Sequence, residues 1–310
     1  MFDPVYIFYY LIFPGFLFTA VVGLLTTWVD RKVSARVQWR VGPPWYQPFA
    51  DTAKLLGKEV ILPAGAKRTG FLLWPVVGLA AATLASMILW LVNLRPETSF
   101  VGDSIVVIYI LTIPAISMIL GASASGNPLG IVGASREMKL LFAYELPLVI
   151  SILTTIYKVG SFSFQSVLAH QAQEGVMLGS VSGVIAFIVV IFCTQAKLTF
   201  LPFDIPEAET ELAGGSHIEY SGAALAVVRL NMAIMFFVMP VLIITFFWGG
   251  IAFTGWRILT SILKYVAIVV IIVLIKNTNP RVRIDQAVRF FWGPMFVLSI
   301  AAMILAVLGY

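Results

Sequence analysis

The sequence predicts an all-α protein that crosses a membrane about eight times and forms a single integral membrane domain over residues 1–310. Hydrophobic residues make up 60% of the chain and charged residues only 11%, whereas soluble domains carry about 25% charged residues. Apolar stretches of spanning length recur along the chain, and basic residues gather in alternate connections. The net charge of +5 is therefore interpreted as a topology signal, and no nucleic-acid partner is expected.

Eight stretches have the roughly 20 apolar residues that a spanning helix needs. The first is too long for the apolar core of a signal peptide. The predicted spans are residues 6–29, 71–94, 104–123, 139–157, 177–201, 222–248, 256–276 and 286–308. Five contain a proline that predicts a kink, namely Pro14, Pro114, Pro147, Pro240 and Pro294.

The distribution of Lys and Arg predicts the orientation in a cell membrane. The even-numbered connections contain three basic residues, Arg95, Lys158 and Arg257. The odd-numbered connections contain fifteen: Arg31, Lys32, Arg36, Arg40, Lys54, Lys58, Lys67, Arg68, Arg136, Lys139, Lys197, Lys276, Arg281, Arg283 and Arg289. Because basic loops remain on the cytoplasmic side, we expect the long odd-numbered loops in the cytoplasm and both termini outside.

An acidic run, TFLPFDIPEAETELAGGSHIEY at residues 199–220, lies between two predicted spans and contains no Lys or Arg. Prolines predict a helix that starts at Pro206 and places Glu207 and Glu211 on one face. Repulsion and burial should then raise at least one pKa. Charge runs are usually solvated loops, but flanking apolar segments favour a proton or cation path. The candidate carboxylates are Asp204, Glu207, Glu209, Glu211 and Glu219.

Two further carboxylates lie at the predicted fourth span. Ser135 is expected to cap this helix, so Glu137 is best explained as a first-turn residue that complements the helix dipole. Glu145 lies deeper. A carboxylate within a spanning helix usually faces a polar interior and a partner, so Glu145 is predicted to belong to a proton or ion path.

The first long loop, residues 30–59, predicts two helices separated by the Gly-Pro-Pro break at 42–44. Composition alone favours an amphipathic hairpin on the membrane surface, with a docking surface or pocket wall as the alternative. The last basic connection, residues 277–285, is interpreted as a surface cap without chemistry. The charged residues of the first loop at helical spacing are Arg31, Arg36, Arg40, Asp51 and Lys54.

Cysteine and histidine are too scarce for a metal centre. Cys193 is the single cysteine, which excludes an internal disulfide and a cluster held by cysteines of this chain alone. The two histidines, His170 and His217, are far apart in sequence. We therefore expect no metal site built from this chain alone.

Four segments together resemble a known family over essentially the whole chain. They are RKVSARVQWRVGPPWYQPFADTAKLLGKE, GNPLGIVGASREMKLLFAYELPL, LPFDIPEAETELAGGSHIEYSG and PRVRIDQ, in this order. They are similar to the H-subunit family of respiratory complex I, the membrane subunit that forms the floor of the quinone chamber. The family has counterparts in membrane-bound energy-converting hydrogenases and related ferredoxin-dependent complexes.

Three departures from the quinone-reducing members favour the hydrogenase-type or sulfur-reducing relatives. Only residues 44–46 separate the Gly-Pro turn from Gln47-Pro48, where the quinone enzymes have a longer segment. The fourth predicted helix starts ASREMKLL, and the Glu-Thr-Asn-Arg run expected before Pro202 is absent. A quinone-chamber subunit of an NADH-dependent complex remains the alternative.

The resemblance implies a subunit of an oxidoreductase complex that carries no redox centre itself. Its partners would be peripheral hydrogenase- or dehydrogenase-like large and small subunits and antiporter-like membrane subunits within the lipid bilayer. Those partners would hold iron–sulfur clusters and, in a hydrogenase, a nickel–iron site, with ferredoxin as electron donor. Two competing interpretations are a stand-alone ion-coupled carrier and a purely structural anchor.

Motif positions carry the family's roles onto this chain. Glu207, Glu209, Glu211 and Glu219 would form the entrance of an acidic path for H⁺ or Na⁺. Asp204 would lie at its mouth and Glu145 deeper in the bilayer. The interface with the peripheral arm would include Arg31, Arg36, Arg40, Asp51 and Lys54.

Overall fold

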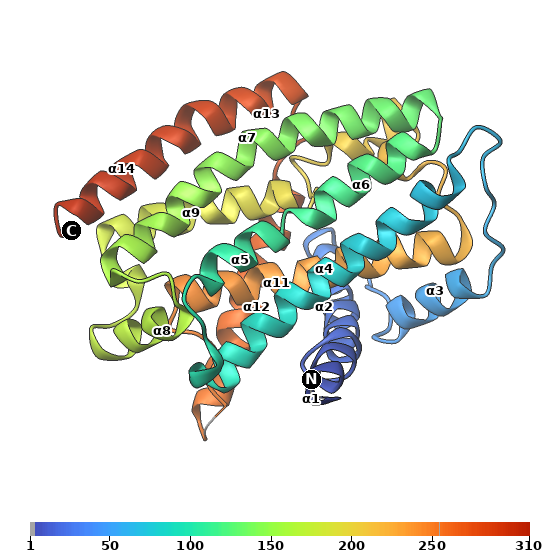
Figure 1. Ribbon diagram of the computed structural model, residues 1–310. Coiled ribbons are helices and arrows are strands. Elements are labelled where there is room, and N and C mark those ends of the chain that lie inside the picture. The colour runs from blue at the N-terminus through green and yellow to red at the C-terminus, as the bar shows by residue number, and fades with distance from the viewer. Residues whose placement is uncertain (1–3, 254) are drawn as a thin grey trace.

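A computed structural model describes residues 4–253 and 255–310, without the side chains of Pro4 and Glu209, and every regular element there is a helix (Figure 1). The first half contains α1 (Pro4–Leu11), α2 (Phe16–Val37), α3 (Gln47–Leu56), α4 (Arg68–Leu94), η1 (Pro96–Thr98), α5 (Asp103–Ile110), α6 (Ile113–Ala124) and α7 (Pro128–Val159). The second half contains α8 (Phe164–Gln173), η2 (Met177–Gly179), α9 (Val181–Lys197), η3 (Ile205–Glu207), α10 (Glu209–Leu212), η4 (Gly215–His217), α11 (Gly222–Phe247), α12 (Arg257–Thr278), α13 (Ile284–Phe290), η5 (Phe291–Met295) and α14 (Phe296–Val307).

Each predicted span coincides with an apolar helical segment. Within the described residues, seven segments are long and apolar enough to cross a membrane. The predicted span at 177–201 contains α9, which has only 17 residues. At 1.5 Å per residue α9 extends over about 26 Å, the lower limit for spanning the hydrocarbon core.

Three of the five prolines interrupt their helices. The chain leaves helical conformation around Pro14, between α1 and α2, and again just before Pro114, between α5 and α6. Pro294 lies in η5, a π-helical turn that joins α13 to α14. By contrast, α7 and α11 continue through Pro147 and Pro240. The predicted kinks are therefore helix breaks at two positions and a π-turn at a third.

The central element of the bundle is α11. In its most apolar stretch of 18 residues, 94% of the residues are buried inside the protein. Its side chains are apolar on nearly all sides, as in helices packed in the interior of a bundle. α2 and α4 pack against it, and α7 packs against α6, α9 and α14 (Figure 1). In the view of Figure 1 the acidic run and α3 lie toward the right end of the bundle, and α8 lies at the opposite end. We call the former the basic end, because the Arg- and Lys-rich connections lie there.

The first long loop folds as the sequence predicts. α2 continues past the predicted span to Val37, and the chain then turns before α3 begins at Gln47. Pro48 occupies the first turn of α3, where its missing N–H costs nothing. α3 packs against α2 and α11 instead of lying apart from the bundle.

The predicted start of the fourth spanning helix is wrong. α7 begins at Pro128, where the Asn127 side chain accepts a 2.8 Å hydrogen bond from the Leu129 backbone N–H. Ser135 is therefore not a cap, and Glu137 lies in the third turn of α7 rather than the first. The explanation of Glu137 as a residue that complements the helix dipole fails with it.

The acidic run does not form one helix from Pro206. It folds into η3, α10 and η4, and Ala208 breaks the helical path with φ −51° and ψ 94°. Glu207 and Glu211 consequently belong to different turns and contact different partners.

Candidate functional site: an inner cavity lined by buried charged groups

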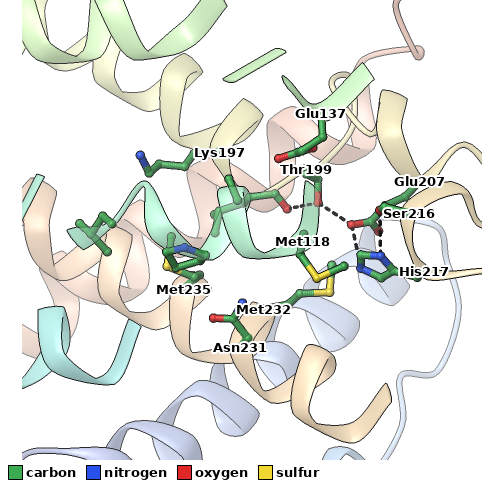
Figure 2. Close-up of a pocket in the computed structure, with 14 residues that line it drawn as sticks. Met118, Glu137, Lys197, Thr199, Glu207, Ser216, His217, Asn231, Met232 and Met235 are labelled. Carbon is green, nitrogen blue, oxygen red and sulfur yellow. Dashed lines mark hydrogen bonds and ion pairs between the residues drawn. The ribbon is translucent and has the colours of Figure 1, made fainter. Parts of the chain in front are cut away.

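An inner cavity of about 50 Å³ lies between α6, α7, α11 and the segment from Lys197 to His217 (Figure 2). That volume has room for water. Three methionines, Met118, Met232 and Met235, form part of its apolar wall. Its polar lining consists of Glu137, Lys197, Thr199, Glu207, Ser216, His217 and Asn231.

Glu207 and His217 face each other across one side of the inner cavity (Figure 2). The Thr199 hydroxyl donates a 2.9 Å hydrogen bond to Glu207 Oε1, and His217 Nε2 lies 3.3 Å from the same oxygen. That second contact has ion-pair distance without hydrogen-bond geometry. Burial lowers the pKa of His217, although the charge of Glu207 opposes this shift. Burial therefore favours the neutral imidazole of His217, which lies beside the Glu207 carboxylate.

Glu137 is the most buried carboxylate of the inner cavity. Only 4% of the residue is exposed, and its Oε2 has no hydrogen-bond partner in the described part of the chain. A buried carboxyl oxygen without a partner is costly. Protonation would remove the charge of the carboxyl group, and water in the cavity would supply the missing hydrogen bond.

Close packing holds α7 against η4 at this wall. A Cβ atom on Gly133 would lie 2.5 Å from the Ser216 backbone nitrogen, so only glycine allows this approach. Glu137 lies one helical turn beyond Gly133, and His217 directly follows Ser216. The glycine thus fixes the distance between two titratable side chains.

An ion pair continues from the inner cavity into the bundle. Lys197 Nζ lies 3.1 Å from Glu145 Oε2 and 5.5 Å from the ring centroid of Tyr144. The Lys197 side chain is only 1% exposed, and its ammonium group points away from Glu207 and His217 (Figure 2). Glu145 thus has a basic partner inside the bundle, and its place in an ion path stays a prediction.

A second, larger space, the lateral cavity of about 680 Å³, lies between α2, α3 and α11. Glu207, Thr199 and Met232 line both cavities. The Glu207 side chain therefore stands in the wall between a large chamber at the basic end and the small buried chamber.

Charged residues of the first long loop line the lateral cavity. Arg31, Asp51 and Lys54 are among them, which supports the pocket-wall interpretation for these three. Arg31 donates a 2.9 Å hydrogen bond to Asp51, and this interaction lowers the pKa of the Asp51 carboxyl group. Arg36 and Arg40 do not line either cavity, and their interface role stays a prediction.

Two other predicted path residues bind arginines outside the inner cavity. Asp204 accepts hydrogen bonds from Nε of Arg281, at 2.7 Å, and from its Nη2. Arg136 donates a 2.5 Å hydrogen bond to Glu211 and lowers the pKa of that carboxyl group. The expectation of a raised pKa is therefore wrong for Glu211, because the neighbour that decides it is a cation rather than Glu207. The loop of Arg281, expected to have no chemistry, anchors Asp204.

Glu219 does not line the inner cavity. The side-chain amide of Asn127 donates a hydrogen bond to Glu219, which joins the end of the acidic run to the start of α7. The Glu209 side chain lies outside the described parts of the chain. Of the six predicted path residues, Glu207 lines the inner cavity, and Glu145 reaches it through Lys197.

Of the titratable residues that line the inner cavity, three are not predicted by the sequence to belong to the site. Its pattern assigns Glu137 to the first turn of a helix, Lys197 only to the topology charges and His217 only to the acidic run. Lys197 offers no signal in the sequence, because a basic residue at the end of a spanning helix usually extends to the membrane interface. Glu137 offers none either, since its burial follows from a helix start that the Gly/Pro-rich turn conceals.

Known proteins share both the sequence and the architecture. Residues 10–307 match the family described as NADH dehydrogenase. The chain is 31% identical over 309 residues to the H subunit of the NADH-quinone oxidoreductase of Geobacillus kaustophilus (strain HTA426), covering 94% of this chain and 91% of that protein. It is 32% identical over 306 residues to the corresponding protein of Bacillus thuringiensis (strain Al Hakam), with coverages of 93% and 90%.

A solved structure matches the fold along its whole length. One chain of the membrane-bound sulfane sulfur reductase, an archaeal respiratory membrane complex, superposes with a TM-score of 0.87 and 26% sequence identity. The match covers 98% of this chain and 100% of that chain.

Proposed function

Because the chain belongs to the NADH dehydrogenase family, as a membrane subunit of a multisubunit oxidoreductase complex, we propose that it couples redox chemistry to ion movement. The observation that carries this proposal is the position of Glu207 in the wall of both cavities. A change of charge in the lateral cavity therefore alters the electrostatic potential at the Glu207 carboxylate, which also lines the inner cavity.

Electrostatics supplies the coupling step. A negative charge that arrives in the lateral cavity raises the proton affinity of Glu207, and each pKa unit corresponds to about 1.4 kcal/mol. Thr199 holds one oxygen of Glu207, and His217 Nε2 lies 3.3 Å away as the next proton carrier. Cavity water then connects His217 to Glu137. The Lys197–Glu145 ion pair lies next along this path. Its rearrangement would transmit the change of charge at Glu137 to neighbouring membrane subunits.

The basic end of the bundle is the proposed docking face for the peripheral electron-transfer arm. Fifteen basic residues in the odd-numbered connections against three in the even-numbered ones support a cytoplasmic location for this end, with both termini outside. Arg36 and Arg40 extend from α2 into the following loop, beyond the cavity walls. The peripheral subunits would hold the iron–sulfur and any nickel–iron centres and receive electrons from ferredoxin.

The sulfane sulfur reductase likeness supports a hydrogenase-type or sulfur-reducing complex as the subtype. The lateral cavity, at about 680 Å³, favours the second candidate, a quinone chamber, because ligand pockets commonly have this size. The similar proteins of Geobacillus and Bacillus carry quinone in their names. Metal analysis of the solubilised complex and assays with reduced ferredoxin separate the candidates. Nickel together with H₂ evolution identifies a hydrogenase. Reduction of polysulfide identifies a sulfur-reducing complex, and reduction of quinone identifies a quinone-reducing complex.

The coupling role is tested in the intact complex reconstituted in liposomes. Glu207→Gln is expected to retain electron transfer from ferredoxin and to lose ion translocation. Glu97→Gln, an exposed substitution in η1, serves as the matched control. A structural anchor predicts instead that neither Glu207→Gln nor Glu145→Gln affects coupling. A stand-alone carrier predicts that the purified chain moves ions without its partners.

A further inference from the structure

A groove of about 480 Å³ lies between α7 and the helix formed by α13 and η5, and it shares no lining residue with the inner or lateral cavity. Lys139 and Phe142 line it from α7, and Arg289 and Trp292 line it from the other helix. Asp285 is its single carboxylate. The function proposed above uses none of these side chains.

Helix lengths place the two cations of this groove at the depth of lipid headgroups. α7 and the α13–α14 helix lie side by side and run in the same direction (Figure 1). From Lys139 to the end of α7 at Val159, the helix rises about 30 Å, and from Arg289 to the end of α14 at Val307 about 27 Å. Both distances match the hydrocarbon core of a bilayer. No charged residue follows Arg289 in the sequence.

The side chains of the groove form an amphiphilic surface. Lys139 and Arg289 are exposed, and neither has a hydrogen-bond or ion-pair partner among the described residues. Phe142 is 65% exposed and Trp292 59% exposed. Leu146, one turn further along α7, continues the exposed apolar strip toward the membrane interior. Tryptophan at a membrane interface typically lies at headgroup level.

We propose that this groove binds an anionic phospholipid of the leaflet at the basic end. Its phosphodiester lies between Lys139 and Arg289, the glycerol backbone lies against Trp292, and one acyl chain follows Phe142 and Leu146. Basic pockets between spanning helices recognise anionic headgroups in this way. With Asp285 included, the groove carries one net positive charge, which a single phosphodiester balances. The exposed apolar side chains next to the two cations favour a phospholipid over a free phosphate ion, because a phosphate ion has no acyl chain to contact them.

Native mass spectrometry of the detergent-solubilised, delipidated complex tests the site. The complex is titrated with phosphatidylglycerol or with phosphatidylcholine, and lipid retained on the released membrane subunit is counted. Lys139→Gln/Arg289→Gln is expected to weaken binding of one phosphatidylglycerol about 30-fold, the factor contributed by two basic residues near an anionic headgroup. Lys67→Gln/Arg68→Gln removes two exposed charges at the start of α4 and is the matched control.

A charge-preserving variant keeps the test informative if the double substitution impairs assembly. Lys139→Arg/Arg289→Lys is expected to retain the lipid. Equal retention of phosphatidylglycerol by wild type and Lys139→Gln/Arg289→Gln would overturn the proposal. So would equal retention of phosphatidylcholine by the wild type, which would indicate unspecific boundary lipid. A cross-link from Lys139 to another subunit in the intact complex would also overturn it, because protein would then cover the groove.

Discussion

Removing the Glu145 carboxylate is expected to destabilise the subunit, because Lys197 would keep a buried charge without its partner. The Lys197 ammonium lies 3.1 Å from Glu145 in a side chain that is 1% exposed. Breaking a buried pair by removing one partner costs about 3–5 kcal/mol. Glu145 itself is 22% exposed, so solvent moderates the effect. We expect Glu145→Gln to lower the free energy of unfolding by about 3 kcal/mol, the lower end of that range.

The double variant Glu145→Gln/Lys197→Met removes both charges together. Replacing a buried ion pair by uncharged groups is often neutral, so the double variant is expected to recover most of the loss. The assay is denaturation by a harsh detergent in mixed micelles, followed by circular dichroism. Glu97→Gln is the control and should change stability by less than about 0.5 kcal/mol, since its side chain is exposed.

Additive losses of unfolding free energy in the two single variants would contradict an interaction between Glu145 and Lys197. If the double variant were as unstable as the sum of Glu145→Gln and Lys197→Met, the two side chains would not interact energetically. The ion pair would then not stabilise the segment that connects the inner cavity to the bundle.

Two further predictions concern the wall of the inner cavity. Gly133→Ala is expected to lower the free energy of unfolding by about 1–3 kcal/mol, as overpacking generally does, because the new Cβ would lie 2.5 Å from the Ser216 backbone nitrogen. Gly293→Ala is the control in the same denaturation assay, because a Cβ there meets no neighbouring side chain or other segment within 4 Å. Burial lowers the pKa of His217 below its ordinary value of 6.5, so the unfolded chain binds the proton first as pH falls. Stability should be complete above pH 6.5 and decrease below it, and His217→Gln should flatten this dependence; an unchanged slope would exclude His217 as its source.

The length of the apolar stretches predicts the helical segments of the fold well. The predicted spans correspond to helical segments because burying a backbone in lipid leaves almost no other conformation. The loop at residues 42–44 and the start of α3 at Gln47 could also be predicted from neighbouring residues, because proline and glycine restrict or free the backbone at their own positions. The predicted start of α7 is misplaced because Asn127 and Pro128, in a turn-like stretch, form an N-terminal cap.

The partners of the acidic run could not be predicted from spacing. Glu211 binds Arg136 of α7 and Asp204 binds Arg281 of the last inner connection, and both arginines are distant in sequence. Glu137 joins the inner cavity only because α7 starts early and packs against η4. Such contacts depend on how the helices pack, which the periodicity of a single sequence does not record.

The ratio of ions moved to electrons transferred, measured for Glu137→Gln in the reconstituted complex, tests the central claim most directly. Glu137 lines the inner cavity with 4% exposure but does not line the lateral cavity. Glutamine keeps the size of the side chain and removes its ability to carry a proton. The account predicts that electron transfer continues while ion translocation is lost. An unchanged ratio would contradict an ion path through the inner cavity.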